Sequence, residues 1–212
     1  MHIAPVPPLR TVALAVALLM LLGCAAQPPP PPPKVLTAEE AAARTVVPLT
    51  RPIALDKAGQ IVNLEFELPP AGADLAPAVL IGLRVAGDEE SAEKARWLLN
   101  GYDLMAKVQL FRKGSATDVR VPLKRYDVSA RRVVQLDPEG LVPQPIVLSP
   151  APWPLQDAGL VSPALHYASL GLAFVPDATP GQYRLSIDLL EDRPELKDLN
   201  AELYVAYMGR SK

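Results

Sequence analysis

The sequence has few of the residues from which many enzyme and metal sites are built. Its 212 residues include one cysteine and two histidines, and aromatic residues make up only 5% of them. A single cysteine excludes an internal disulfide and a cysteine-rich zinc or iron–sulfur site, and two histidines leave little for metal binding. A net charge of −2 excludes a strongly basic nucleic-acid-binding protein. We therefore expect no cofactor, no metal ion and no nucleic-acid partner.

Long apolar runs are scarce as well, apart from one near the N-terminus. Residues 12–22 form an unbroken apolar run of eleven residues. This run is too short for a membrane span of about 20 residues, but it fits the apolar region of an export signal. The segment Leu21–Cys24 that ends it resembles the lipobox of bacterial lipoproteins, in which the chain is cleaved before the cysteine and the cysteine is acylated. The alternatives are an ordinary secretory signal and a buried helix with an incidental cysteine.

The resemblance to a lipoprotein implies a place in the cell envelope. Acyl chains on Cys24, such as palmitate, would hold the protein on the lipid bilayer, because more than one chain makes anchoring persistent. Ala25 and Ala26 follow the cysteine, in place of the aspartate that resembles an inner-membrane retention signal. We therefore expect a lipoprotein of the outer membrane that faces the periplasm, with the periplasmic face of the inner membrane as the alternative.

Proline is abundant, with 25 residues against 12 glycines, and it marks linkers and loops. Six consecutive prolines, Pro28–Pro33, favour an extended polyproline II spacer. Thr37 and Glu40 have the spacing of a capping box, which predicts a short helix up to Arg44. We divide the chain into a signal peptide (1–23), a lipidated N-terminus with a proline-rich linker (24–45) and one folded domain (46–212).

Alternation of apolar and polar residues dominates from residue 46 onward and predicts half-buried strands. The segments that show it are 62–68, 79–85, 104–110, 119–123, 170–174, 183–189 and 203–207. One helix is expected over Glu89–Leu99, with Asp88 as its cap and Gly101 at its end. Between Ser149 and Ala164, prolines prevent regular ladder hydrogen bonds and predict a loop. The pattern predicts an antiparallel sandwich or barrel, and we favour a mainly β fold, an antiparallel β-sandwich with one short helix.

Candidate catalytic residues are few. His166 is the only histidine after the predicted signal, and no nucleophile motif such as Gly-x-Ser-x-Gly accompanies it. Acidic residues gather over 88–93 and over 188–198. The first group is typical of helix capping and the second of an exposed turn, although paired carboxylates also serve hydrolysis when burial separates their pKa values. We therefore assign no catalytic residue.

A basic stretch is the better candidate for an interaction surface. Between residues 112 and 132 the chain has seven basic residues against Asp118 and Asp127. Such a flank suits anionic head groups, glycan phosphates or an acidic protein, although cations on strand faces also protect sheet edges. Trp153 is a further candidate, as an anchor for a partner or as a cover of the core. The candidate surface comprises Arg112, Lys113, Arg120, Lys124, Arg125, Arg131, Arg132 and Trp153.

Two C-terminal motifs carry a resemblance to a protein family. Pro180–Leu185 places a glycine turn before a strand, and Leu189–Leu196 contains a proline that stops strand pairing. Both segments are similar to motifs of a family of small proteobacterial lipoproteins of unknown function. Pro52–Leu55 and the strand from Val62 to Leu68 fit the same family more loosely. The resemblance implies a β-sandwich architecture and an envelope location, and it supplies no catalytic residues.

Together these observations predict a non-catalytic binding or structural module of the cell envelope, with a protein partner and without enzyme activity. An immunity lipoprotein that neutralises a periplasmic toxin is a second hypothesis. The third is an envelope hydrolase that uses His166 or the late acidic residues. The ligand and the oligomeric state stay open at this point.

Overall fold

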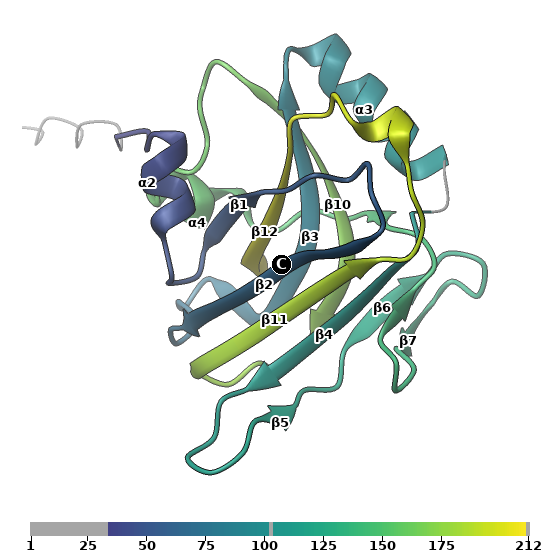
Figure 1. The fold of residues 1–212 in the computed structure, drawn as a ribbon. Coiled ribbons are helices and arrows are strands. Elements are labelled where there is room, and N and C mark those ends of the chain that lie inside the picture. The colour runs from purple at the N-terminus through teal and green to yellow at the C-terminus, as the bar shows by residue number, and fades with distance from the viewer. Residues whose placement is uncertain (1–33, 102–103, 211–212) are drawn as a thin grey trace, which may run out of the picture. The chain divides into compact units, whose positions relative to one another are not determined.

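The computed structural model describes residues 34–101 and 104–210. The predicted signal peptide, Cys24 and the six prolines lie outside the described residues. The described chain is mainly β, and its strands form two antiparallel sheets that pack as a sandwich (Figure 1). The predicted fold class is therefore confirmed.

The elements run as follows within the described residues. The first sheet has the order β1 (Leu49–Pro52), β12 (Ala201–Gly209), β3 (Leu75–Gly87), β10 (His166–Val175), β6 (Lys124–Asp127) and β7 (Arg132–Gln135), with β9 (Ile146–Val147) also paired to β10. The second sheet has the order β2 (Gly59–Leu68), β11 (Gly181–Leu189), β4 (Ala106–Arg112) and β5 (Val119–Arg120), with β8 (Leu141–Val142) also paired to β4. The helices are α2 (Ala38–Ala43), α3 (Glu89–Gly101), α4 (Pro152–Asp157) and the short 3-10 helix η1 (Pro194–Leu196).

The main hydrophobic core lies between the two sheets, and the first sheet is also buried on its outer face. Leu80 and Tyr204 point away from the main core and form a second cluster with Leu155 of α4 and with Leu160. Residues 79–85 of β3 are consequently buried one after another. A strand that is covered on both faces has this continuous burial. β2, which is buried on one face, keeps the alternation of a half-buried strand.

Gly82 permits the close packing of β3 against β12. It lies directly opposite Tyr204, whose hydroxyl donates towards the carbonyl oxygens of Leu148 at 3.0 Å and Leu170 at 3.2 Å. Burial raises the pKa of this hydroxyl well above its ordinary value. A β-carbon at Gly82 would lie 2.3 Å from the Tyr204 hydroxyl oxygen and from the Leu170 carbonyl oxygen. Only glycine therefore fits beneath the tyrosine ring.

Both predicted helix starts are confirmed. Thr37 caps α2 in a complete capping box, and the Asp88 carboxylate accepts a hydrogen bond at 2.7 Å from the backbone N–H three residues further on. The Arg51 side chain of β1 donates to a carbonyl oxygen of α2 at 3.1 Å. Residues 37–44 therefore belong to the same compact unit as the sandwich.

Some predictions of local structure were wrong. The predicted loop 149–164 contains α4, because Pro152 and Pro154 occupy its first turn, where a missing N–H costs no helical hydrogen bond. The predicted strand 119–123 is reduced to β5, because Pro122 has no N–H to donate and the chain leaves the sheet there. The fold also contains further short helices and the short strands β1 and β6–β9, which were not predicted because strands of two to four residues show no clear alternation. No helix in the described ranges is long and apolar enough to cross a bilayer.

Gly82→Ala tests the packing of β3 against β12. We expect it to lower the free energy of unfolding by about 2–3 kcal/mol, because the added methyl group displaces the Tyr204 ring from its two carbonyl partners. Gly72→Ala is the matched control, since the nearest atom to its new methyl group is Leu75 Cδ1 at 3.8 Å. Chemical denaturation compares the two variants, and equal stability would contradict the prediction.

Candidate functional site

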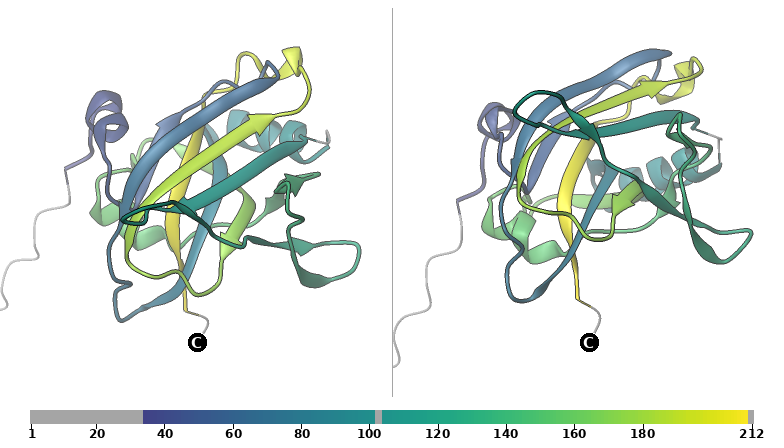
Figure 2. Two further views of the ribbon diagram at one scale, coloured as in Figure 1. Left: turned by 60° about the horizontal axis from the view of Figure 1, so that its bottom comes forward. Right: turned by 90° about the horizontal axis from the view of Figure 1, so that it is seen from below.

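The structure divides the eight predicted surface residues among three places. Arg112, Lys113 and Arg120 lie at the ends of β4 and β5, Lys124, Arg125, Arg131 and Arg132 lie on or beside the β6–β7 hairpin, and Trp153 lies on α4. The hairpin and α4 are on opposite sides of the sandwich in every view (Figures 1 and 2). The eight residues therefore do not form one continuous surface.

The cations at the ends of β4 and β5 differ in their partners. Lys113 forms an ion pair with Glu65, with 2.8 Å between Nζ and Oε2. Arg112 donates to the carbonyl oxygen of Pro180 at 3.1 Å, and Arg120 donates to that of Pro138. Neither arginine forms an ion pair within the described residues. The hydrogen bonds that position these two guanidinium groups therefore go to neutral carbonyl oxygens.

The β6–β7 hairpin stands out from the sandwich (Figure 2). A single residue pair, Lys124 opposite Phe174, joins it to β10. Tyr126 and Val133 lie opposite each other across the hairpin and are 38% and 50% exposed, and Val128 at the turn is 62% exposed. The hairpin thus presents an apolar strip among cations, which is a composition typical of protein interaction surfaces.

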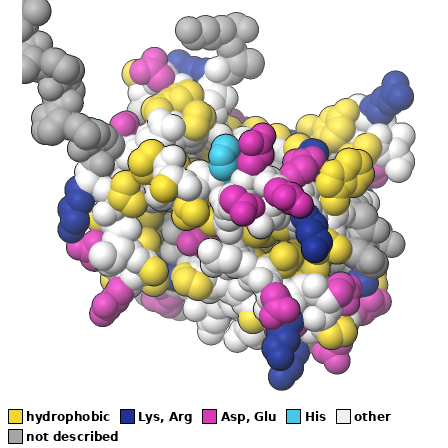
Figure 3. Space-filling view, turned by 90° about the horizontal axis from the view of Figure 1, so that it is seen from above, with side chains coloured by type: hydrophobic (Ala, Val, Ile, Leu, Met, Phe, Trp, Pro, Cys, Tyr) yellow, Lys and Arg dark blue, Asp and Glu magenta, His cyan; other side chains and the backbone are white. Residues whose placement is uncertain are grey.

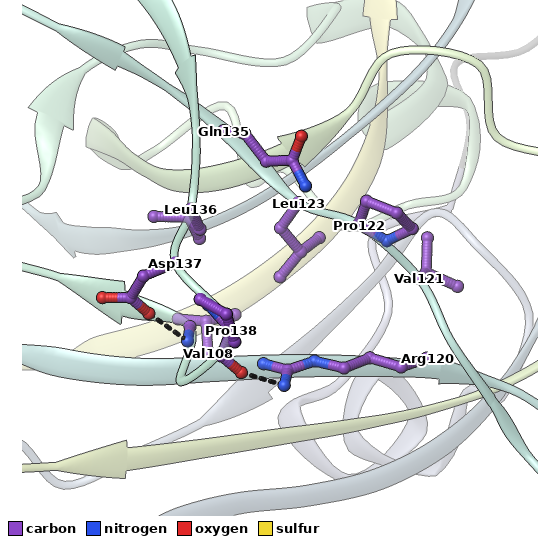
Figure 4. Close-up of a pocket in the computed structure, with 10 residues that line it drawn as sticks. Val108, Arg120, Val121, Pro122, Leu123, Gln135, Leu136, Asp137 and Pro138 are labelled. Carbon is purple, nitrogen blue, oxygen red and sulfur yellow. Dashed lines mark hydrogen bonds between the residues drawn. The ribbon is translucent and has the colours of Figure 1, made fainter.

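A pocket of about 280 Å³ lies between the two sheets next to this hairpin (Figure 4). Val108 of β4 is fully buried at the pocket, and Leu123 and Leu136 on the hairpin side are only 5% and 6% exposed. The remaining lining residues are Arg120, Val121, Pro122, Gln135, Asp137, Pro138 and Gly140. Mostly apolar walls with a few polar groups are typical of small-molecule sites.

The turn from Asp137 to Gly140 closes one side of the pocket. The Asp137 carboxylate accepts hydrogen bonds from the backbone N–H groups of Leu141 at 3.0 Å and Gly140 at 2.7 Å. These bonds lower the pKa of Asp137, and the charge of Arg120 contributes. Gly140 has φ of 83°, and a β-carbon there would lie 2.1 Å from the Val108 carbonyl oxygen. Glycine at this position therefore lets the turn lie directly against β4.

His166 begins β10 and its side chain is exposed. It lines a separate hollow of about 380 Å³ together with Ser149 and Ser169, and with Glu89 and Glu93 of α3. Figure 3 shows this face, where acidic side chains gather near a histidine. In the described part of the chain, no hydrogen bond joins His166 to either serine. The hollow therefore brings candidate groups together without a formed nucleophile–base pair.

Several of the late acidic residues have hydrogen-bond or ion-pair partners. Asp192 accepts a hydrogen bond from the Ala58 backbone N–H at 2.8 Å. Glu191 and Glu195 lie 3.4 Å and 3.9 Å from the Arg193 guanidinium. These contacts are typical of a turn that is fixed in place. Across residues 34–101 and 104–210, no three potential metal-ligating side chains form a group.

Trp153 combines the two roles considered from the sequence, a cover of the core and an exposed anchor for a partner. Its indole ring lies 3.3 Å from the position that a β-carbon on Gly209 would occupy, so it covers the end of β12. It is also 40% exposed. The ring therefore covers the sheet with one part and faces solvent with another.

Sequence reasoning missed the pocket. Leu123 and Leu136 have the pattern of ordinary core residues, and Val108 comes from a different part of the chain. The sequence signal nearest to the site is the turn motif Asp137-Pro138-Glu139-Gly140, which predicts a tight turn but not what the turn covers.

No protein-family model and no curated protein sequence matches the chain. Among solved structures, a crystal structure of a protein from Sulfurospirillum deleyianum is similar, with a TM-score of 0.47 and 11% sequence identity. The match covers 77% of this chain and 98% of that chain. Similarity at this level carries no information about function.

Asp137→Asn tests the turn that closes the pocket. Folding lowers the pKa of Asp137 below its ordinary value of 3.8, so its stabilising effect is complete above that value and is lost as the pH falls through the folded pKa. We expect the variant to be less stable than the wild type near neutral pH. This difference should shrink as the pH falls from about 7 to about 2, a range that includes the titration of aspartate.

Urea unfolding at several pH values measures the effect of Asp137→Asn. Asp177→Asn is the control, because Asp177 is exposed in the turn after β10 and its side chain has no hydrogen bond with any described residue. The control should keep the pH profile of the wild type. A stability difference between Asp137→Asn and the wild type that does not change with pH would show that the carboxylate does not act through its charge.

Proposed function

We propose that this protein is a lipid-anchored lipoprotein of the outer membrane that faces the periplasm and acts as a non-catalytic binding module of the cell envelope. The observation that carries the proposal is Cys24, the only cysteine of the chain, which directly follows Gly23 and an eleven-residue apolar run. A lipobox needs a thiol at this position. The six prolines that follow would hold the domain off the bilayer by about 19 Å, at about 3.1 Å per residue.

The β6–β7 hairpin supports the binding role. Tyr126 and Val133 form an exposed apolar pair, and Arg131 and Arg132 are exposed beside them. Aromatic residues and arginine are enriched at protein interfaces. β7 is also the last strand in the order of its sheet, so its outer edge is open to a strand from a partner. A protein partner with an acidic surface fits these features.

An envelope hydrolase is the second candidate, because His166 shares a hollow with Ser149, Ser169 and two carboxylates. This function predicts that His166→Ala abolishes an envelope-hydrolysing activity without unfolding the protein. A purified domain that leaves peptidoglycan, lipid and ester substrates intact counts against it. If the protein is an immunity lipoprotein, its partner would be a toxin that is delivered into the periplasm.

Removal of the thiol tests the anchor. We expect the wild-type chain to sediment with outer membranes, because acylated Cys24 holds it there. Cys24→Ala, placed behind a cleavable secretory signal, should move to the soluble periplasmic fraction with the same thermal stability. Membrane fractionation with mass spectrometry of the N-terminal peptide measures both. A Cys24→Ala chain that stays with the membrane would contradict the lipid anchor.

Charge reversal on the hairpin tests the binding role. We expect in-cell crosslinking and affinity purification to recover one stoichiometric protein partner from the wild type and from the Cys24→Ala chain. The double variant Arg131→Glu/Arg132→Glu should lose this partner, because the reversed charges repel an acidic surface. Lys94→Glu on α3 is the matched control, since Lys94 is exposed and away from the hairpin. Equal recovery from the double variant and the control would remove the hairpin from the proposal.

A further inference from the structure

The pocket between the sheets combines apolar walls with one cation, Arg120, and one carboxylate, Asp137, which accepts hydrogen bonds from the backbone N–H groups of Gly140 and Leu141. Val108, Leu123 and Leu136 form walls from both sheets, and Arg120 is the only cation among the lining residues. Figure 4 shows its guanidinium bonded on the Pro138 side of the pocket. A ligand that fits this lining has an apolar body and a polar or negatively charged end.

A second hollow extends the pocket at its positive end. It has a volume of about 450 Å³ and shares Arg120, Val121 and Pro122 with the pocket. Every charged residue that lines it is a cation, namely Arg112, Lys113 and Arg120. A ligand with its tail in the pocket would therefore place its head group among positive charges.

The partners of these cations show which charges are available to a ligand. The neighbouring ion pairs join Lys107 to Glu139, Lys113 to Glu65 and Arg184 to Asp118. Arg112 and Arg120 are bonded to carbonyl oxygens instead. The charge of Arg120 lowers the pKa of Asp137 and Glu139, but both of these carboxylates already have donors, backbone N–H groups and Lys107.

We propose that the pocket binds a single alkyl chain with an anionic head group, with the tail between the sheets and the head between Arg120 and Arg112. The inference goes beyond the proposed protein-binding role of the hairpin. A carboxylate and a phosphate share the chemistry that an arginine recognises, since both accept paired N–H donors. The head group of a free fatty acid and that of a single-chain phospholipid both meet this requirement.

The size of the pocket sets the length of the tail. A volume of about 280 Å³ equals roughly nine water molecules at about 30 Å³ each, and a methylene group is about as large as a water molecule. The pocket therefore has room for a chain of roughly ten carbons. Burial of each methylene should strengthen binding about fourfold until the pocket is full.

Calorimetric titration of the purified chain tests the inference. The protein is the Cys24→Ala chain secreted behind a cleavable signal, and the probes are decanoate, decyl phosphate, decanol and decylammonium. We expect at least tenfold tighter binding of the two anions than of decanol or decylammonium. Octanoate, with two methylenes fewer, should bind roughly 15-fold more weakly than decanoate. A preference for decanoate indicates a fatty acid, and a preference for decyl phosphate indicates a single-chain phospholipid.

Three variants locate the site. Arg120→Gln should reduce the affinity for decanoate to that for decanol, because the head group loses its cation. Val121→Trp should abolish binding of all four probes, because the indole ring fills the space that the pocket shares with the second hollow. Arg210→Gln is the matched control and should bind as the wild type does, because Arg210 is exposed, donates to the Leu75 carbonyl oxygen at 3.0 Å and lies outside the pocket lining. Thermal unfolding checks that each variant is folded, and Arg120→Gln alone decides the test if Val121→Trp does not fold.

Equal affinity for all four probes, absence of binding, or anion binding that Arg120→Gln leaves unchanged would overturn the inference. The outcomes are separate from those of the proposed function. A chain that binds decanoate but is soluble and recovers no partner would refute the proposed function and keep the pocket. A membrane-bound chain that recovers a protein partner but binds no amphiphile would support the proposed function and refute the ligand site in the pocket.

Discussion

Burial of β3 and β12 on both faces is the constraint on which the rest of the structure depends. The main core covers one face, and α4 with its flanking segments covers the other. Arg84 on β3 is only 3% exposed in this outer layer. Its charge is accommodated because it donates to Glu202 at 2.7 Å and to the Leu160 carbonyl oxygen at 2.8 Å. A strand pair enclosed in this way has a single register, because a shift by one residue would turn Arg84 into the main core without its partners and move Gly82 away from Tyr204.

The edge next to the β6–β7 hairpin lacks this constraint, and the same local cause produces both the hairpin and the pocket. Pro122 and Pro138 cannot donate ladder hydrogen bonds, so β5 ends after two residues and β7 is not extended. The sheets therefore lose their regular pairing here, and side chains from the two sides enclose a cavity in place of a closed core. A binding site at this edge does not disturb the doubly buried strands, since it lies outside their packing.

The elements that could be predicted from the sequence are those in which one physical signal dominates. Residues 62–68 and 183–189 keep a strict alternation because the outer face of their sheet is exposed, and Thr37 and Asp88 identify helix starts because their side chains satisfy backbone donors. α4 escaped prediction because proline is compatible with a first helical turn. The pocket escaped it for a different reason. Its walls come from segments that meet only in three dimensions, and Arg120 is its one lining residue that belongs to the predicted surface.

The partner of each cation decides which of the predicted basic residues suit a ligand. Lys113 and Arg125 are in ion pairs with Glu65 and Asp127, so an anion would have to compete with a carboxylate for them. Arg120 is held by a carbonyl oxygen and forms no ion pair within the described residues, and its charge lowers the pKa of the nearby Asp137 and Glu139. A guanidinium has five N–H donors, and a bond to one carbonyl leaves donors for a second acceptor. A positioned arginine loses little side-chain freedom when an anion arrives, which lowers the entropic cost of binding. Selective anion recognition is therefore compatible with a chain whose net charge is −2, because it depends on local pairing and not on the overall balance.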